Sequence, residues 1–315
     1  FHVIVLLELI KNWLAMQADW IKRRLSLNWK QGIARIIRHQ KRYKRLGGNE
    51  MENVTIGFIG FGNMAQAIVE GLLLKNVLKP EQIYICAKNW DKLCKNADKH
   101  GVCACKTSRE VAEHAEIVVV AVKPYLVEEV LSPILEILKE KIVVSVAVNI
   151  LFEKLESFLL PGTHHISTLP NTPVAVGEGI ILCEERHSLT EKEFEKIKEL
   201  FSEISMVEVV DARHLGIAGT LSGCGPAFTA MFIEALSDGA VLHGLPRELS
   251  YQLASQMVVG TGKLQISTKR HPGAMKDAVC SPGGTTIKGV TALEQKGFRS
   301  AVIGAIDAIE QKNGR

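Results

Sequence analysis

The sequence lacks the cysteine and histidine patterns of a metal site, and it has no long apolar run. Neither a CxxC nor an HxxxH pair occurs, and Cys103 and Cys105 are too close together for a zinc knuckle. The seven cysteines are an odd number, in a chain too long to need disulfides. The apolar stretch that opens the chain is interrupted by Glu8 and Lys11, far short of the ~20 apolar residues of a membrane span. We therefore expect a cytoplasmic protein with reduced thiols, no metal and no membrane anchor.

The charge is unevenly distributed along the 315 residues, a length that suits about two domains. Residues 1–50 hold 11 Lys/Arg and 3 Asp/Glu, whereas residues 51–315 hold 27 and 31, so the two parts carry +8 and −4. The overall charge of +4 is thus no indication that the main body binds nucleic acid.

Two interpretations of residues 1–50 stay open. One is a basic helix on a membrane surface. We favour the other, a translated ribosome-binding site, because codons for Leu46, Gly47 and Gly48 can contain an AGGAGG core shortly before Met51. We expect residues 1–50 to be a non-native or dispensable extension.

A dinucleotide-binding loop follows the first apolar segment of the main body. Residues 54–60 predict a strand, and the sequence then reads GxGxxA through Gly60, Gly62 and Ala65 before a helix that runs to about residue 75. Gly60 permits the tight turn, Gly62 lets a pyrophosphate approach the helix, and Ala65 keeps helix and strand close. This placement, more than the motif alone, predicts a nucleotide site.

Strand and helix patterns then alternate, which is typical of a parallel sheet. We expect strands at 82–86, 102–104, 116–122 and 142–147, then at about 164–169 and 174–182, and a helix near 190–201. The predicted fold class is α/β, with a Rossmann-like doubly wound sheet in residues 51–211 followed by an all-helical dimerisation and substrate domain in residues 212–315.

The helical part predicts a homodimer. It contains a Gly/Pro-started helix from Ser222 that ends near Gly244, and a second helix that begins near Arg247. The first is apolar on most faces, more than one small domain can cover. No lysine occurs from Ser222 to Gly262, which excludes the β-hydroxyacid dehydrogenases, since they need a lysine acid/base on this helix.

Two further segments indicate ligands. The second strand ends in Ala87, Lys88 and Asn89 with no acid before Asp91, which favours NADPH over NADH, although NADH stays an alternative. Near the end of the chain, CSPGGTTIKG places glycines before a helix that starts at Thr285 or Thr286. Such a helix start can hold a carboxylate, although an ordinary capped turn has the same pattern.

These stretches together resemble the pyrroline-5-carboxylate reductase family from about Val54 to Gln311. The matching pieces are GFIGFGNMA, AVKP, LPNTPV, LSGCGPAF, GLPRELS and HPGAMKDAVCSPGGTTIKGVTALE. The resemblance implies reduction of Δ1-pyrroline-5-carboxylate to L-proline with NAD(P)H, the last step of proline biosynthesis. It also implies a homodimer built through the helical domain, often assembled into a larger ring of dimers.

The resemblance assigns roles residue by residue. Gly284, Thr285 and Thr286 would bind the substrate carboxylate through backbone N–H groups, in a loop with Ser281 and Gly283, and the catalytic Thr286 hydroxyl would reach the ring nitrogen. Cofactor contacts would come from Ile59, Gly60, Phe61, Gly62, Asn63, Met64, Ala87, Lys88, Ala121, Val122, Lys123 and Pro124, with Val146, Ala147 and Val148 near the nicotinamide.

Several positions depart from the family pattern and keep open the reduction of a related cyclic imine. A non-catalytic NADP-binding sensor on the same fold is a second alternative, although a sensor would need only the phosphate loop. Asn149 stands where the family has glycine, but asparagine tolerates left-handed backbone geometry and should keep the turn. His164, His165, His187, His214 and His243 lie outside the matching motifs, so we expect none of them to be the proton donor. The other departures are Val148, Ser167, Gly216, Ile217 and Cys224.

Overall fold

The computed structural model describes residues 53–312, and the expectation for residues 1–50 lies outside them. Residues from Thr55 onward belong to one compact unit. An eight-stranded sheet has the order β3-β2-β1-β4-β5-β6-β7-β8. The strands are β1 Ile56–Ile59, β2 Ile83–Cys86, β3 Cys103–Ala104, β4 Ile117–Val120, β5 Ile142–Ser145, β6 His164–Pro170, β7 Gly179–Glu184 and β8 Ser205–Val210.

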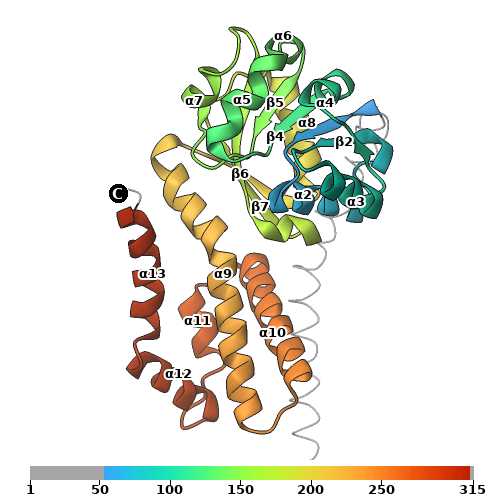
Figure 1. The fold of residues 1–315 in the computed structure, drawn as a ribbon. Coiled ribbons are helices and arrows are strands. Elements are labelled where there is room, and N and C mark those ends of the chain that lie inside the picture. The colour runs from blue at the N-terminus through green and yellow to red at the C-terminus, as the bar shows by residue number, and fades with distance from the viewer. Residues whose placement is uncertain (1–52, 313–315) are drawn as a thin grey trace, which may run out of the picture. The chain divides into compact units, whose positions relative to one another are not determined.

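Strands β1 to β6 are parallel, β7 runs antiparallel to β6, and β8 runs parallel to β7. The predicted Rossmann-like sheet is thereby confirmed. Every residue of β1, β4 and β5 is buried, because helices cover both faces of the sheet's centre. In the view of Figure 1, α5 and α6 lie in front of the sheet and α8 lies behind it.

The connecting helices are short. They are α2 Asn63–Leu74, η2 Pro80–Gln82, α3 Trp90–His100, α4 Ser108–His114, η3 Pro124–Leu126, α5 Val127–Leu131, η4 Ser132–Ile134, α6 Leu135–Leu138, α7 Phe152–Glu156, η5 Thr172–Val176 and α8 Glu191–Ser202. Val111 of α4, Leu131 of α5 and Leu155 of α7 share one apolar cluster with the central strands. This cluster fixes the strand ends on which the candidate site is built.

The predicted strand at 174–182 is correct only from Gly179. Residues Thr172–Val176 form the 3-10 helix η5, because Pro173 sits in its first turn and Gly177 ends it in the left-handed region with φ 72°. The edge strand β8, SMVEVV, was not predicted although three of its six residues are valines, and its residues are exposed or half-buried.

The predicted helix start at Ser222 is wrong. One helix, α9, runs through all 31 residues of Ala212–Leu242 and contains Pro226. Asp211 sets the start, because its side chain accepts hydrogen bonds from the N–H groups of Arg213 at 2.9 Å and His214 at 3.2 Å. Proline in a helix leaves the carbonyl four residues earlier without a donor. Here Asn171 Nδ2 donates to that carbonyl, the oxygen of Ser222, at 3.0 Å.

The remaining helices are α10 Arg247–Thr268, α11 Pro272–Asp277, α12 Thr285–Gln295 and α13 Phe298–Lys312. The apolar side chains of α9 and of these four helices are widely exposed, with Met231 of α9 at 68% and Ile266 of α10 at 74%. By length and composition α9 could also cross a membrane. However, α9 packs against β6, β7, α10 and α13 within the chain, so its exposed side chains fit a second copy of the protein better than lipid.

Gly71 generates the first prediction, because it lets α2 lie directly on η5. A Cβ at this position would overlap the backbone oxygen of Val174. Gly71→Ala should therefore lower the free energy of unfolding by about 1–3 kcal/mol in denaturant titrations. Leu74→Ala at the end of the same helix is the control, since Leu74 is 59% exposed, and it should change the free energy of unfolding by less than about 0.5 kcal/mol. A stabilised Gly71→Ala variant would show that α2 and η5 are not in close contact.

Candidate active site

The loop after β1 has the geometry of a phosphate site. Gly60 has φ 92°, and a Cβ there would lie 2.7 Å from both the carbonyl oxygen of Ala121 and Cγ1 of Val122. Gly62 is the N-cap of α2 and offers no side-chain cap, and nothing lies within 4 Å of where its Cβ would be. The first N–H groups of α2 are thus open to an anion, which fits the pyrophosphate of a dinucleotide.

The other predicted cofactor residues gather at the same edge of the sheet. Strands β1, β2, β4 and β5 are parallel and in register, so their carboxyl ends lie side by side. This edge, which we call the cofactor edge, consists of Ile59 to Met64 after β1, Ala87 and Lys88 after β2, Ala121 to Pro124 after β4, and Val146 to Val148 after β5.

Lys88 lies exposed between β2 and α3. The neighbouring Asn89 is occupied as the N-cap of α3, where its Oδ1 accepts a hydrogen bond from Lys92 N–H at 3.0 Å. Asp91 belongs to the first turn of α3, so no carboxylate stands at the strand end to bind a ribose hydroxyl. Lys88 is thus a basic side chain directly after β2, with no acidic side chain beside it before Asp91.

The turn after β5 keeps a defined shape despite its unusual sequence. Asn149 has φ 63°, which confirms the left-handed geometry expected for it. Ala147 N–H donates to Ser145 Oγ at 3.3 Å, and the Ser167 hydroxyl donates to the Ile150 carbonyl at 2.9 Å. This hydrogen bond of Ser167 connects β6 to the turn after β5, a role that the sequence did not indicate. Val148 is 61% exposed at the cofactor edge.

The segment Ser281–Thr286, which we call the substrate seat, forms a second uncapped helix start. Gly283 has φ 69°, and Gly284 N–H donates to the Ser281 carbonyl at 3.0 Å. Gly284 is the N-cap of α12 without a side-chain cap, and the first turn of α12 has no acid. Thr285 and Thr286 are exposed. The predicted helix start is confirmed, and its N–H groups can receive a carboxylate.

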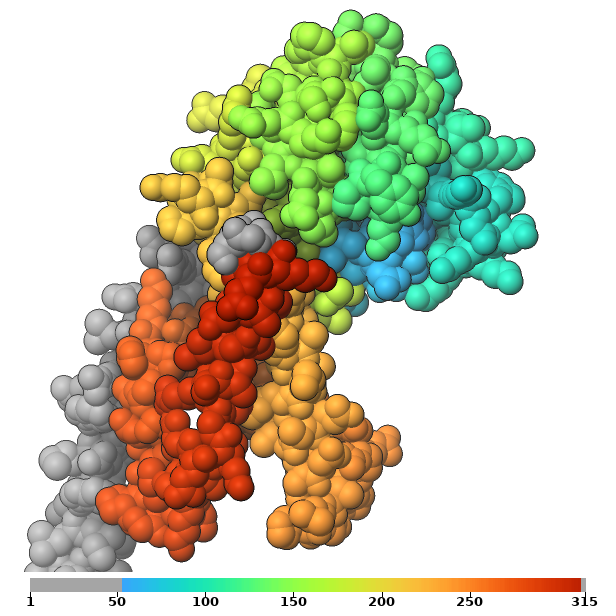
Figure 2. Space-filling model, turned by 60° about the vertical axis from the view of Figure 1, so that its left-hand side comes forward, coloured from blue at the N-terminus to red at the C-terminus, as the bar shows by residue number. Residues whose placement is uncertain are grey.

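Within one chain, the substrate seat and the cofactor edge are not together. In Figure 1, α12 lies at the end of the helical region that is remote from the sheet. Its main contacts are with α13. Figure 2 shows an open groove between α12–α13 and the far half of α9. The chain therefore carries both parts of the predicted site but does not join them.

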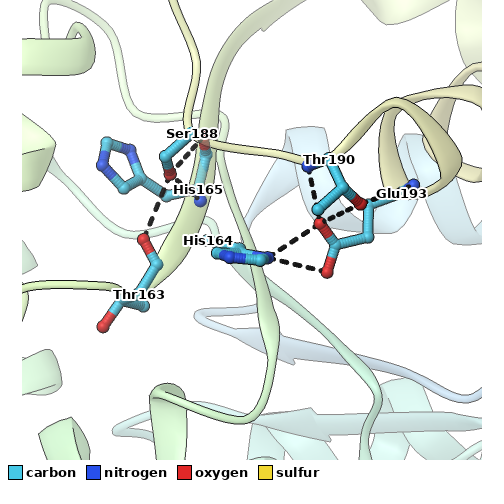
Figure 3. Close-up of polar contacts among 6 residues, drawn as sticks. All are labelled: Thr163, His164, His165, Ser188, Thr190 and Glu193. Atoms are coloured by element: carbon cyan, nitrogen blue, oxygen red, sulfur yellow. Dashed lines mark hydrogen bonds and ion pairs between the residues drawn. The ribbon is translucent and has the colours of Figure 1, made fainter.

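His164 and His165 lie away from the cofactor edge. His164 pairs with Ile142 at the start of β5, so both histidines stand at the opposite edge of the sheet. Figure 3 shows His164 Nδ1 2.8 Å from both carboxylate oxygens of Glu193, which also accepts hydrogen bonds from Thr190. Burial alone would raise the Glu193 pKa, but these bonds outweigh it and hold the pKa below its usual range.

Two further histidines lie outside the cofactor edge. His187 stacks on Phe194, and His214 pairs with Asp211 at 2.7 Å at the start of α9. Burial raises the pKa of the Cys86 thiol, behind the phosphate loop, to about 11. In residues 53–312, no group of three or more His, Cys, Asp or Glu side chains could hold a metal ion.

The fold and site define a class of protein, a Rossmann-domain NADP oxidoreductase with a separate helical domain. Residues 55–149 match the family model "NADP oxidoreductase coenzyme F420-dependent", and residues 212–315 match "Pyrroline-5-carboxylate reductase dimerisation". The second match makes the helical region a dimerisation domain, which agrees with its exposed apolar side chains.

Comparison with whole proteins narrows the class. Pyrroline-5-carboxylate reductase from Treponema pallidum is 39% identical over 81% of this chain and 98% of its own length. The Escherichia coli enzyme is also 39% identical, over 82% of this chain and 96% of its own length. The structure of pyrroline carboxylate reductase from Plasmodium falciparum, solved with NADP bound, has a TM-score of 0.74 and 30% sequence identity. The match covers 83% of this chain and 97% of that chain. The chain belongs to the pyrroline-5-carboxylate reductase family, a family of NAD(P)-dependent oxidoreductases.

Asn149 generates the second prediction. A β-branched residue in the left-handed region costs about 1–2 kcal/mol, whereas glycine adopts it freely. Asn149→Val should therefore lower the free energy of unfolding by about that amount, and Asn149→Gly should leave it unchanged or raise it. Urea titrations of the three proteins measure both. Equal stability of the valine and glycine variants would contradict the turn geometry.

Proposed function

We propose that the protein reduces Δ1-pyrroline-5-carboxylate to L-proline by hydride transfer from NADPH, the last step of proline biosynthesis, in the cytoplasm. The observation that carries the proposal is the pair of helix starts that have glycine as the N-cap and no side-chain cap, at Gly62 and at Gly284. One lies in the nucleotide domain and suits a pyrophosphate, and the other lies in the dimerisation domain and suits a carboxylate. A dinucleotide-binding sensor needs only the first of them.

The chemistry requires positioning more than a strong acid. A cyclic imine protonated on nitrogen is already an electrophile, so the protein has to orient it and exclude water. Gly284, Thr285 and Thr286 would hold the carboxylate through backbone N–H groups, on the turn that Ser281 and Gly283 shape. The Thr286 hydroxyl would accept the hydrogen bond of the ring N–H. Bound NADPH supplies the hydride to the imine carbon.

The complete site is composed of two subunits. Because the substrate seat and the cofactor edge lie apart in one chain, the seat of one subunit would face the cofactor edge of its partner in the homodimer. Interlocked helices would fill the groove beside α9 and cover its exposed apolar residues. The dimers would assemble further into a ring, which the mass of the native protein in solution tests.

The cofactor would lie along the cofactor edge, with Val146, Ala147 and Val148 next to the nicotinamide and Lys88 at the 2′-phosphate. NADH would bind the same residues, but it lacks the 2′-phosphate, so Lys88 would make no contact with it. The structure with NADP bound from the related Plasmodium falciparum protein supports this choice.

Lys88 generates the third prediction. Lys88→Glu should raise the KM for NADPH roughly tenfold or more, because a charge-assisted hydrogen bond of about 1.5–3 kcal/mol becomes a repulsion. The KM for NADH should hardly change. Lys95→Glu, an equal charge change at an exposed position of α3, is the control and should leave both values near normal. Equal losses with both cofactors would show that Lys88 does not contact the phosphate.

Thr286 generates the fourth prediction. Thr286→Val keeps the shape of the side chain but removes the partner of a charged N–H, a loss of roughly 1.5–3 kcal/mol. Turnover with pyrroline-5-carboxylate should fall roughly 10- to 150-fold, while NADPH affinity should barely change. Steady-state kinetics and cofactor titration measure the two effects.

Thr285→Val is the matched control, because its backbone N–H remains, and it should weaken substrate binding only slightly. If the two variants behave alike, the Thr286 hydroxyl has no special role. A wild-type protein that binds NADPH but does not oxidise it with pyrroline-5-carboxylate would favour the sensor. Faster turnover with another cyclic imine would favour the second alternative.

A further inference from the structure

Asn171, directly after β6, uses all its polar groups in hydrogen bonds and is only 5% exposed. Its backbone N–H donates to the Ile180 carbonyl at 3.0 Å, and its Oδ1 accepts from Ile180 N–H at 2.8 Å. Its carbonyl accepts from Val174 N–H at 3.3 Å. Its Nδ2 donates to the Ser222 carbonyl at 3.0 Å. Hydrogen bonds at both the oxygen and the nitrogen of the side-chain amide fix its orientation.

Pro226 is the reason why the Ser222 carbonyl can accept this bond. In an unbroken helix, the N–H of residue 226 would pair with the carbonyl of residue 222, but proline has no N–H. The side chain of Asn171 takes the place of that donor, from a different part of the fold. Asn171 of the motif LPNTPV and Ser222 of the motif LSGCGPAF are 51 positions apart in the sequence. The donor that one motif supplies thus pairs with the acceptor that the other leaves open.

The bond joins the two halves of the chain at a specific place. Asn171 follows β6, whose end lies at the cofactor edge because β6 is parallel to β5. On the same strand, the Thr168 hydroxyl donates to the Ser145 carbonyl at 2.9 Å, just before the turn that would meet the nicotinamide. On the other side, α9 is the first helix of the dimerisation domain.

We propose that Asn171 is a positioning residue for catalysis, which holds the cofactor edge at a fixed place on α9 and so sets the distance between the nicotinamide and the partner's substrate seat. This inference rests on the proposed function. It assigns to Asn171 no contact with substrate or cofactor. Its effect passes through α9 and the dimer interface, so it should appear in turnover more than in cofactor binding.

The experiment distinguishes two effects of Asn171: it donates a hydrogen bond to the Ser222 carbonyl, and it holds α9 in place next to β6. Asn171→Ala removes the bond and leaves that carbonyl unpaired, so the melting temperature should fall by about 3–10 °C. Adding Pro226→Ala gives residue 226 an N–H, which can pair with Ser222 within the helix and restore part of the lost melting temperature. The double variant still lacks the connection to β6. Pro226→Ala alone supplies the reference for the cycle.

Turnover, the KM for NADPH and the dimer mass are measured well below the melting temperatures. We expect Asn171→Ala to lower turnover at least roughly tenfold with the KM for NADPH within about threefold, and the double variant to stay slow although its stability partly returns. Turnover that returns together with stability, or normal turnover in Asn171→Ala, would overturn the proposal. Because wild-type turnover is measured in the same assay, failure of the proposed function is recognised separately.

Lys263→Ala is the matched control. Lys263 of α10 forms an ion pair with Glu178 at 3.1 Å, which also joins the two parts of the chain, but both side chains are about 60% exposed. Exposed pairs contribute little. This variant should keep nearly normal turnover and melting temperature, and a loss as large as that of Asn171→Ala would show that any contact between the two parts has the same effect.

Discussion

The proline in the middle of α9 is the constraint on which the arrangement of the two domains depends. Pro226 interrupts the hydrogen bonding of a 31-residue helix, and the carbonyl that it leaves unpaired is bound by Asn171. A buried carbonyl without a donor costs about 1–3 kcal/mol, so the bond from Asn171 stabilises this helix beside β6 by about that amount. The helical domain and the sheet therefore favour one relative position. On the other side of Asn171, η5 packs on α2 through Gly71, which extends the same connection to the phosphate loop.

The helix starts divide into two kinds. Helices α3, α8 and α9 begin at Asn89, Thr190 and Asp211, whose side chains cap the first N–H groups. Helices α2, α10 and α12, like the shorter α5, α6 and α7, begin without a cap from the N-cap side chain, and α2 and α12 have a glycine there, Gly62 and Gly284. Glycine at the N-cap is only a few tenths of a kcal/mol less favourable than a capping side chain, so α2 and α12 lose little stability. The open N–H groups are what a pyrophosphate and a carboxylate need, and this explains why glycine stands at both positions.

The sequence predicted the features that depend on local pattern. The parallel sheet, the GxGxxA loop, the left-handed Asn149 and the start of α12 at Thr285 all follow from residues near one another in the chain. Contacts between residues that lie far apart in the chain could not be predicted from the sequence. The helix start at Ser222 was predicted wrongly because Pro226 normally marks a helix start, and only the distant Asn171 makes it tolerable inside one. Strand β8 was missed although its valines are typical of a strand, and in the structure it pairs with β7 at the edge of the sheet. The motif LPNTPV was noticed, but nothing in the sequence links its asparagine to Ser222.

The central claim is that each active site combines the cofactor edge of one subunit with the substrate seat of the other. Gly62→Glu should block the pyrophosphate without disturbing the fold, because nothing lies within 4 Å of its Cβ, and Thr286→Val impairs the seat. When the two variants are produced together, about half of the dimers are mixed, and one of the two sites in each mixed dimer has both parts intact. The measurement is the turnover of this mixture with pyrroline-5-carboxylate and NADPH. The account predicts about a quarter of wild-type turnover, well above either variant alone. Turnover no higher than the average of the two variants would contradict it, because a site formed within one chain is defective in every subunit of the mixture.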